Sequence, residues 1–427
     1  MGKVWDVVVV GAGPAGLCAG ISAAQEGARA LVLEKNKDPG GKLPFSGGGR
    51  GNLTHAGEIQ ELCRHYHGGD GPSAACRFLR PALYAFSNAD LMNFFARRGL
   101  PLVVEPDGRV FPRTNRAKDA LHVLLGEAEK LGVQIHAEAR VVHLDKTPSG
   151  FSVREAGRRK STVKGLCVVI ATGGLAHPQL GAADDGYRLA ERLGHSIVPC
   201  RPALVPVIVN ASAFAPFRDC AGVTIKDTSV ILERSGMVLW KKRGDVLFTH
   251  RGLSGPAVLD ISREVEPGDV LRIVLVPGLK ELVSAEKRIL REISLKARRT
   301  IPNILHDLGV SRSLARALVK AQGIDPETLA ANLTRESRRS LLESLVLGHP
   351  FPVESVAGWE EAMVTRGGVA LSQVNPKTME SRVVQGLFFA GEVLDVDGES
   401  GGYNLQAAFS TGFLAGRSAA LKALGLA

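Results

Sequence analysis

The stretch Val7–Gly16, VVVVGAGPAG, decides the fold of this chain. Four consecutive valines are typical of a parallel strand that is buried on both faces. The run leads directly into G-x-G-x-x-G, formed by Gly11, Gly13 and Gly16. In such a turn the first glycine permits the tight bend, the second lets the backbone approach a pyrophosphate, and the third lets a helix pack closely on the strand. We expect that helix over Pro14–Glu26, with its N-terminal amides directed at the phosphates.

An acidic residue follows at the appropriate distance. The apolar run ALVL continues into Glu34 and Lys35, and Glu34 lies 18 residues after Gly16. A carboxylate at the end of this second strand accepts hydrogen bonds from ribose hydroxyls and disfavours a 2′-phosphate. The glycine pattern alone is a weak signal. Strand, glycine turn, helix and acid together predict a Rossmann-like α/β domain that binds a dinucleotide.

A further buried strand and turn extend this domain. The segment CVVIATGG (Cys167–Gly174) is an apolar run that ends at Thr172 and Gly173. A glycine-containing turn at the end of a parallel strand lets the backbone pass close to a bound cofactor. We therefore expect this turn beside the dinucleotide, although it lies far from the first fingerprint in the sequence.

The C-terminal region favours FAD over NAD as the bound cofactor. The segment GLFFAGEVLDVDG (Gly386–Gly398) is an apolar strand followed by Glu392 and Asp397, and such acids bind the ribityl hydroxyls of a flavin. The next segment begins with paired glycines at Gly402 and becomes helical, so its N-terminal amides stabilise negative charge on a reduced flavin ring. No second complete fingerprint with its acid is present. A separate nicotinamide domain is therefore not expected.

Bulk properties agree with a cytoplasmic enzyme of several domains. The chain has 427 residues, 45% hydrophobic and 22% charged, which is ordinary for a globular protein of two or three domains. No apolar run approaches the roughly 20 residues of a membrane span, and the N-terminus lacks the features of a signal peptide. The six cysteines form no CxxC pair and the histidines have no metal-ligand spacing, so we predict neither a disulfide framework nor a metal site.

The positive charge is concentrated in one region. The formal net charge is +10, and between Lys280 and Lys320 ten basic residues face only four acidic ones. A solvated helical face is one interpretation of this cluster. The other is a surface for RNA or another polyanion, because basic clusters are typical of phosphate-binding surfaces. The sequence leaves both open.

Six motifs, taken in order, resemble those of one family. They are GAGPAG, SGGGRGNLT, ATGG, LFTHRGLSGP, VNPKTMES and AGEVLDVDGESGGYNLQ. Together they resemble the BaiN/RdsA-type flavoproteins, and the resemblance extends from about Val4 to Gly416. The last motif is long and specific.

The resemblance implies a fold and a domain order. The fold is a discontinuous FAD-binding Rossmann-like domain of the two-dinucleotide-binding type, interrupted by a small β-barrel and a helical subdomain. Proline-containing stretches at RPALVPV and HPFPVES are expected to mark the two junctions. This gives an FAD domain over 1–199 and 351–427, a barrel over 200–282 and helices over 283–350. The basic cluster then belongs to the inserted helices.

The resemblance also assigns the second glycine-rich stretch, SGGGRG, to a loop that passes along the cofactor to the flavin. Many relatives have cysteine at the position of Gly51, so no thiol is available there in this chain. The residues expected to bind the cofactor are Gly11, Gly13, Pro14, Ala15, Gly16, Glu34, Lys35, Gly41, Lys42, Ser46, Arg50, Asn52, Thr54, Thr172, Gly173, Gly391, Glu392, Asp397, Gly402, Tyr403, Asn404 and Leu405.

Three activities are known in the family. They are reduction of uridine to dihydrouridine in ribosomal RNA, reduction of conjugated bile-acid ketones, and oxidation of aminoacetone. The basic cluster favours the first, with NAD(P)H as the electron source and ribosomal RNA as partner. A small-molecule reductase of unsaturated ketones or an amine oxidase is the alternative, and an RNA-binding protein with a structural FAD is another. His250 is a candidate proton donor, since imidazole titrates near neutral pH; a structural histidine at a strand end is the competing interpretation.

Overall fold

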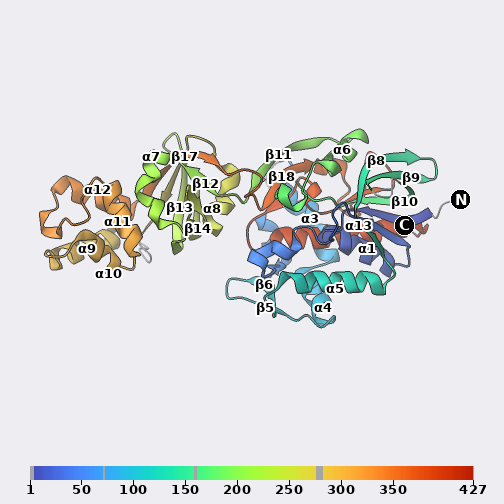
Figure 1. Ribbon diagram of the computed structural model, residues 1–427, viewed down its shortest axis with the longest axis horizontal. Coiled ribbons are helices and arrows are strands. Elements are labelled where there is room, and N and C mark those ends of the chain that lie inside the picture. The colour runs from blue at the N-terminus through green and yellow to red at the C-terminus, as the bar shows by residue number, and fades with distance from the viewer. Residues whose placement is uncertain (1–3, 71–72, 158–160, 276–281, 427) are drawn as a thin grey trace. The chain divides into compact units, whose positions relative to one another are not determined.

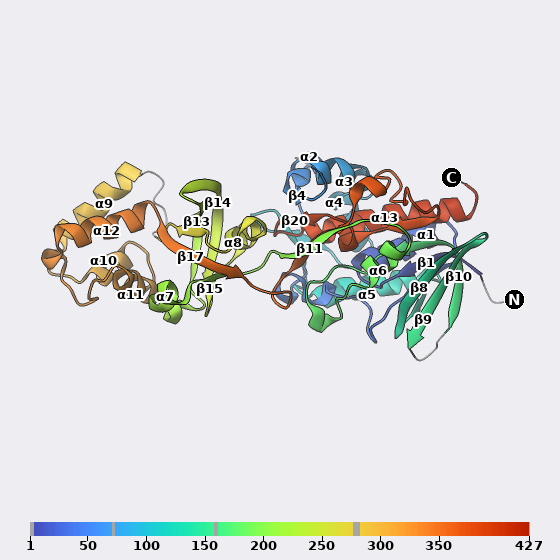
Figure 2. The same cartoon turned by 90° about the horizontal axis from the view of Figure 1, so that it is seen from above.

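The computed structural model describes residues 4–70, 73–157, 161–275 and 282–426. It divides into two compact units (Figures 1 and 2). Unit 1 comprises Met1–Pro202 and Met363–Ala427, and unit 2 comprises Ala203–Ala362. The first unit is therefore built from two distant parts of the chain. No helix in the described ranges combines the length and apolar character that a transmembrane span needs.

In the described residues, the main sheet of unit 1 has seven strands, in the order β7-β2-β1-β10-β9-β8 with β19 beside β10. The valine run forms β1 (Val4–Val10), which pairs in parallel with β2 (Ala30–Leu33) and β10 (Thr162–Ile170). β19 (Leu387–Phe389) pairs in parallel with the other side of β10. Because the carboxyl ends of parallel strands meet at one edge, the segments that follow β1, β10 and β19 come together there.

Two helices that are distant in sequence pack closely against this sheet. α1 (Pro14–Gln25) begins directly after the glycine turn, and α13 (Tyr403–Ala423) follows the last motif. A Cβ atom on Gly412 or Gly416 of α13 would overlap the backbone carbonyl oxygens of α1. These glycines therefore allow direct backbone contact between the first and last helices of the unit (Figure 1).

The other elements of unit 1 complete the sheet and cover it. β8 and β9 form an antiparallel hairpin beside β10. The two-stranded sheets β4–β20 and β11–β18 and the three-stranded sheet β3–β6–β5 lie outside the main sheet. The bounds are β3 Thr54–His55, β4 Tyr66–His67, α2 Ile59–Leu62, α3 Ala74–Ala85, α4 Asn88–Ala96, β5 Leu102–Val104, β6 Arg109–Pro112, α5 Ala117–Lys130, β7 Gln134–His136, β8 Ala139–Thr147, β9 Gly150–Gly157, α6 Asp185–Arg192, β11 Ile197–Ala203, β18 Val364–Val369 and β20 Asp397–Gly398.

Unit 2 contains a closed barrel and a group of helices. The barrel order is β12-β15-β14-β13-β16-β17, and its core includes the contacting rings of Phe214, Phe217, Phe248 and Phe351. The strands are β12 Val207–Val209, β13 Thr224–Arg234, β14 Met237–Phe248, β15 Gly252–Ser254, β16 Val270–Ile273 and β17 His349–Val356. The helices are α7 Ala211–Phe214, α8 Pro256–Ile261, α9 Leu282–Leu295, α10 Ile301–Asp307, α11 Arg312–Ala321 and α12 Arg335–Val346.

Barrel and helices share one hydrophobic core in unit 2. A polar contact also joins them, since Ser344 Oγ on α12 lies 2.8 Å from Nδ1 of buried His349 on β17. Burial lowers the pKa of His349 to about 4, and the nearby charge of Arg272 acts in the same direction. This histidine is therefore a neutral structural residue at ordinary pH.

The α/β fold with an inserted barrel and inserted helices is confirmed. The end of the insertion differs from the sequence expectation. HPFPVES was expected at a junction, but His349–Val356 is the last barrel strand, and unit 2 continues to Ala362. The prolines cause no conflict, because Pro350 and Pro352 are exposed while the alternate residues Phe351 and Val353 point into the core.

Candidate functional site

The glycine turn after β1 leaves an open space at the start of α1. A Cβ atom on Gly11, where φ is +104°, would lie 2.5 Å from the carbonyl oxygen of Ala171, and one on Gly16 would overlap the Gly11 carbonyl. A Cβ atom on Gly13 would instead meet nothing within 4 Å. Packing therefore requires a glycine at Gly11 and Gly16. Gly13 instead borders free space at a helix N-terminus, which suits a pyrophosphate.

Glu34 is fixed at the end of β2. Its side chain is buried, with Oε2 accepting from the amide of Ala12 at 2.7 Å and Oε1 accepting from the amide of Asn36 at 2.8 Å. Each carboxylate oxygen has further lone pairs. The two backbone bonds thus hold the carboxylate next to the glycine turn, and its contact with a ribose diol stays a prediction.

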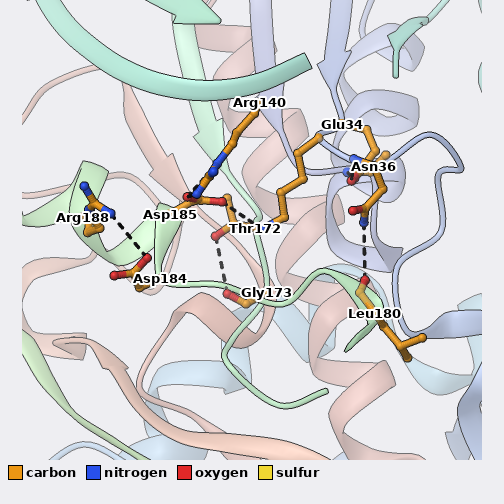
Figure 3. A network of polar contacts seen from close by, with 11 residues as sticks. Glu34, Asn36, Arg140, Thr172, Gly173, Leu180, Asp184, Asp185 and Arg188 are labelled. Carbon is orange, nitrogen blue, oxygen red and sulfur yellow. Dashed lines mark hydrogen bonds and ion pairs between the residues drawn. The ribbon is translucent and has the colours of Figure 1, made fainter. Parts of the chain in front are cut away.

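The neighbouring lysine belongs to a charged network, part of which is shown in Figure 3. Lys35 Nζ lies 2.9 Å from Asp185 Oδ2, and Arg140 Nη2 lies 2.6 Å from Oδ1 of the same carboxylate. Burial of the Asp185 carboxyl opposes its ionisation, but the hydrogen bonds from Arg140 and Lys35 outweigh that effect and hold its pKa below the ordinary value. The Lys35 ammonium, predicted to bind cofactor, is thus engaged by Asp185.

We expect Asp185→Asn to lower the free energy of unfolding at pH 7 by about 2 kcal/mol, because it leaves two cations without their partner. A carboxyl whose folded pKa is depressed contributes stability above its unfolded pKa and loses it as pH falls through the folded pKa. The difference between wild type and variant in urea unfolding should therefore be complete above about pH 3.8, the ordinary Asp value, and should shrink as pH falls further below it. Asp184→Asn is the control, since it removes a carboxylate from a weaker ion pair. Asp184 Oδ1 lies 3.8 Å from Arg188 Nη1, and both side chains are exposed. Equal effects of the two variants would contradict the assignment.

The second glycine-rich loop runs alongside the first. The amide of Gly40 donates to Ala12 O at 2.8 Å, and a Cβ atom on Gly41 would lie 3.7 Å from Gly13 Cα. Lys42 Nζ then lies 2.6 Å from Glu392 Oε2, although the two residues are 350 positions apart. This ion pair brings two predicted cofactor residues together at the edge where the parallel strands end.

In the remaining part of this loop, Arg50 contacts residues of the β5–β6 region and Ser46 bonds within the loop. Arg50 Nη2 donates to Glu105 Oε1 at 2.5 Å, and its guanidinium lies 4.0 Å from the centre of the Phe111 ring. Ser46 Oγ donates to the carbonyl oxygen of Leu43. Arg50 and Ser46 are therefore positioned within the loop by other residues, and their predicted contact with cofactor stays a prediction.

Thr54 and Asn52 connect the loop to α13. Buried Thr54 donates through Oγ1 to Gln406 Oε1 at 2.6 Å. In the amide orientation that satisfies both of its groups, Asn52 donates to Thr54 O at 3.1 Å and accepts from the amide of Gly402 at 3.2 Å. A Cβ atom on Gly402, where φ is +102°, would overlap the Thr54 carbonyl. The loop thus reaches the N-terminus of α13 by direct backbone contact.

The turn after β10 lies at the same edge of the sheet. Thr172 Oγ1 donates to Gly173 O at 3.4 Å, and a Cβ atom on Gly173 would meet nothing within 4 Å. Gly173 therefore borders open space, as Gly13 does.

The turn after β19 is fixed on α13, because the amide of Gly391 donates to Thr411 Oγ1 at 2.9 Å.

The start of α13 holds the other predicted residues. Asn404 Oδ1 accepts from the amide of Gly398 at 2.8 Å and its Nδ2 donates to the Gly398 carbonyl, which closes the turn before the helix. Asp397 is buried on β20, and Leu405 is half-buried. The Tyr403 ring is buried and stacks on the rings of His55 and His65. The sequence analysis did not predict either histidine as a site residue.

His250 belongs to a different unit from the residues above. It is exposed and lies in the turn between β14 and β15 of unit 2. Its role as proton donor therefore stays a prediction. Across the described ranges, no group of three or more His, Cys, Asp and Glu side chains is arranged to hold a metal ion.

Comparison with known proteins gives nearly full-length matches. The family model described as HI0933-like protein Rossmann domain matches residues 5–418. The chain is 33% identical over 407 residues to the ribosomal RNA dihydrouridine synthase of Escherichia coli, covering 95% of this chain and 96% of that protein. It is 32% identical over 423 residues to the 3-dehydro-bile acid delta(4,6)-reductase of Clostridium scindens, covering 96% and 98%.

A solved structure supports the fold. The 3-ketosteroid-delta4-(5alpha)-dehydrogenase from Rhodococcus jostii aligns with a TM-score of 0.52 at 18% identity, covering 98% of this chain and 97% of that one. The open space at Gly13, the Glu34 carboxylate and the N-terminus of α13 fit FAD. The chain belongs to the HI0933-like Rossmann family, the family of the BaiN/RdsA-type flavoproteins, and is an FAD-dependent oxidoreductase.

Proposed function

We propose that this protein reduces the C5=C6 double bond of a uridine in ribosomal RNA, with NAD(P)H as the electron source. The observation that favours RNA over a small molecule is a set of exposed basic side chains on the inserted helices and on the turn between α9 and α10. We call this set the basic surface. Its members are Lys287, Arg288, Arg291, Arg298, Arg312, Lys320, Arg335 and Arg338.

The basic surface is not neutralised by its surroundings. None of its members forms an ion pair with another side chain that the structure describes, whereas Lys296 and Arg299 both pair with Asp307 and Arg316 pairs with Glu327. Unpaired exposed cations attract a polyanion, since each phosphate contact releases a condensed counterion. Unit 2 therefore offers an electrostatic surface for RNA that ene reduction of a small molecule does not require.

The relatives agree with ene reduction as the reaction class. Two of them, from Escherichia coli and Haemophilus influenzae, are named ribosomal RNA dihydrouridine synthase, and the chain is 33% and 31% identical to them. A uracil C5=C6 bond is conjugated to the C4 carbonyl, as a steroid double bond is conjugated to its ketone. When bound, the reduced cofactor supplies the hydride to the β carbon. The residues near the cofactor hold it, orient the acceptor and supply a proton to the α carbon.

The second candidate is reduction of an unsaturated ketone. It is favoured by the 32% identity to a 3-dehydro-bile acid delta(4,6)-reductase over nearly the whole chain. Both candidates share the same chemistry at the flavin, so the cofactor site cannot separate them. The acceptor must be identified directly.

Competition between acceptors separates the candidates. The protein is reduced anaerobically with NADPH or NADH, and reoxidation of the flavin is followed after addition of unmodified large-subunit ribosomal RNA, of an unsaturated steroid ketone, or of buffer. We expect RNA to reoxidise the flavin fastest and added salt to slow that reaction steeply. Fast reoxidation by the ketone with none by RNA would overturn the proposal in favour of the second candidate.

A further inference from the structure

A group of titratable side chains lies at the N-terminus of α13, and of these only Tyr403 was predicted to contact the cofactor. We call it the histidine cluster; its members are His65, His67, Glu399 and Tyr403. β4 (Tyr66–His67) pairs with β20 (Asp397–Gly398), which places the string RHYH against the motif DVDGESGGYN. Two segments more than 300 residues apart thereby bring two imidazoles and a carboxylate together.

His65 and Glu399 form the tightest contact in the histidine cluster. Nδ1 of His65 lies 2.7 Å from Oε2 of Glu399, and the Glu399 amide donates to the His65 carbonyl at 2.9 Å. Oε1 of the same carboxylate lies 4.0 Å from Nε2 of His67. The Glu399 side chain is 15% exposed and that of His65 is 38% exposed. The carboxylate is thus enclosed, while the imidazole reaches solvent.

The ring of His65 is held in one orientation from two sides. Glu399 fixes its Nδ1 edge, and the Tyr403 ring stacks on its face, with centroids 4.4 Å apart and planes 20° apart. Tyr403 is itself held by Tyr66, whose hydroxyl donates to the Tyr403 carbonyl at 2.9 Å. The other ring nitrogen, Nε2, forms no hydrogen bond with any side chain or backbone group that the structure describes. A histidine oriented by a carboxylate at one nitrogen and open at the other is suited to proton transfer.

Other proton donors at this end are less suitable. Burial raises the pKa of the Cys63 thiol to about 12 and holds the pKa of the Tyr66 hydroxyl well above its ordinary value. Both ring nitrogens of His55 face backbone carbonyl oxygens, those of Ala56 at 2.6 Å and Asp107 at 3.0 Å. Gly51 supplies no thiol. Within the described part of unit 1, His65 therefore offers an open ring nitrogen at the start of α13.

We propose that His65, oriented by Glu399, donates the proton that completes ene reduction, an assignment that rests on the proposed function. The acceptor's β carbon gains a hydride from the reduced cofactor, and the π electrons of the double bond move onto the α carbon and its conjugated carbonyl. The α carbon then takes the proton from Nε2 of His65 in its doubly protonated, imidazolium form, and the Nε2–H bond breaks as the new C–H bond forms. Glu399 keeps its hydrogen bond to Nδ1–H throughout, so the ring is left as the neutral Nδ1–H imidazole, and Nε2 takes up a proton from solvent before the next turnover.

The test separates proton transfer from hydride supply. His65→Gln is compared with His143→Gln, because His143 also faces a carboxylate, Asp145 at 3.2 Å, and its side chain is 37% exposed. Anaerobically reduced protein is mixed with unmodified ribosomal RNA or with 2-cyclohexen-1-one. We expect H65Q to slow flavin reoxidation by about 100-fold, since general acids contribute 10²–10⁴-fold. Reduction by NADPH should be unchanged, and H143Q should match wild type.

A second readout does not depend on turnover. In the FAD-free protein with ¹⁵N-labelled histidine, the neutral His65 ring should carry its proton on Nδ1, because Glu399 accepts it there, and Glu399→Leu should move the proton toward Nε2. A ring that carries its proton on Nε2 in wild type would overturn the proposal, as would wild-type reoxidation rates in H65Q. If wild type reduces neither acceptor, ene reduction and the donor role fall together. If the wild type reduces one of the two acceptors and H65Q reduces it at the same rate, only the role of His65 as proton donor is overturned.

Discussion

Replacing Gly13 by alanine should weaken FAD binding by about 100-fold, which corresponds to roughly 3 kcal/mol, while leaving the FAD-free protein nearly as stable as wild type. The physical reason is the open space at this position, where a Cβ atom meets no protein atom within 4 Å. A methyl group there occupies the place that the pyrophosphate needs for its approach to the backbone. The backbone of Gly13 is extended, with φ −74° and ψ −176°, which alanine adopts without strain.

The matched control is Gly16→Ala. Its added methyl group would overlap the carbonyl oxygen of Gly11, so this variant should lose stability with or without cofactor. Affinity is measured by flavin fluorescence titration, and stability of the FAD-free proteins by urea unfolding. If G13A binds FAD as wild type does, or if G16A is fully stable, the assignment of the pyrophosphate to the glycine turn is contradicted.

Reversing two charges of the basic surface should weaken the reaction with RNA by about 10-fold to 100-fold and reduce its salt dependence. We choose Arg298→Glu with Arg312→Glu, because both side chains are exposed and neither pairs with a described carboxylate. Arg299 is excluded, since it pairs with Asp307 at 2.5 Å and its reversal would also remove an ion pair. Flavin content and reduction by NADPH should be unchanged.

A control variant carries the same change in net charge elsewhere. Arg97→Glu with Lys118→Glu alters two exposed side chains of unit 1. The rate of flavin reoxidation by RNA is measured for both double variants at several salt concentrations. Equal rates in the two double variants would show that the basic surface does not contact RNA.

The cofactor fingerprint was predictable because it is local. The strand Val4–Val10, the glycine turn and the helix Pro14–Gln25 follow one another directly in the sequence, and packing requires a glycine at Gly11 and Gly16. The sequence predicted Lys42 and Glu392 as cofactor residues but did not predict the ion pair between them. Their contact depends on the parallel order of β1, β10 and β19, which the sequence does not state.

Two features were missed for physical reasons. Prolines at 350 and 352 suggested a junction, yet strand β17 accommodates them because both face outward while Phe351 and Val353 fill the barrel. His65 gave no signal as a site residue, since its carboxylate partner is Glu399, 334 positions away. Such a pair becomes visible only once β4 and β20 are known to be adjacent.

The central claim is that this flavoprotein reduces uridine in ribosomal RNA. The most direct measurement reduces the purified, FAD-loaded protein anaerobically with NADPH, adds unmodified large-subunit ribosomal RNA, and analyses the RNA by mass spectrometry. We predict a gain of about two daltons at one uridine, as two hydrogens add across the double bond, in proportion to the flavin reoxidised. The claim would be contradicted if the RNA stayed unmodified and the flavin stayed reduced after RNA was added, while an unsaturated ketone reoxidised the flavin rapidly.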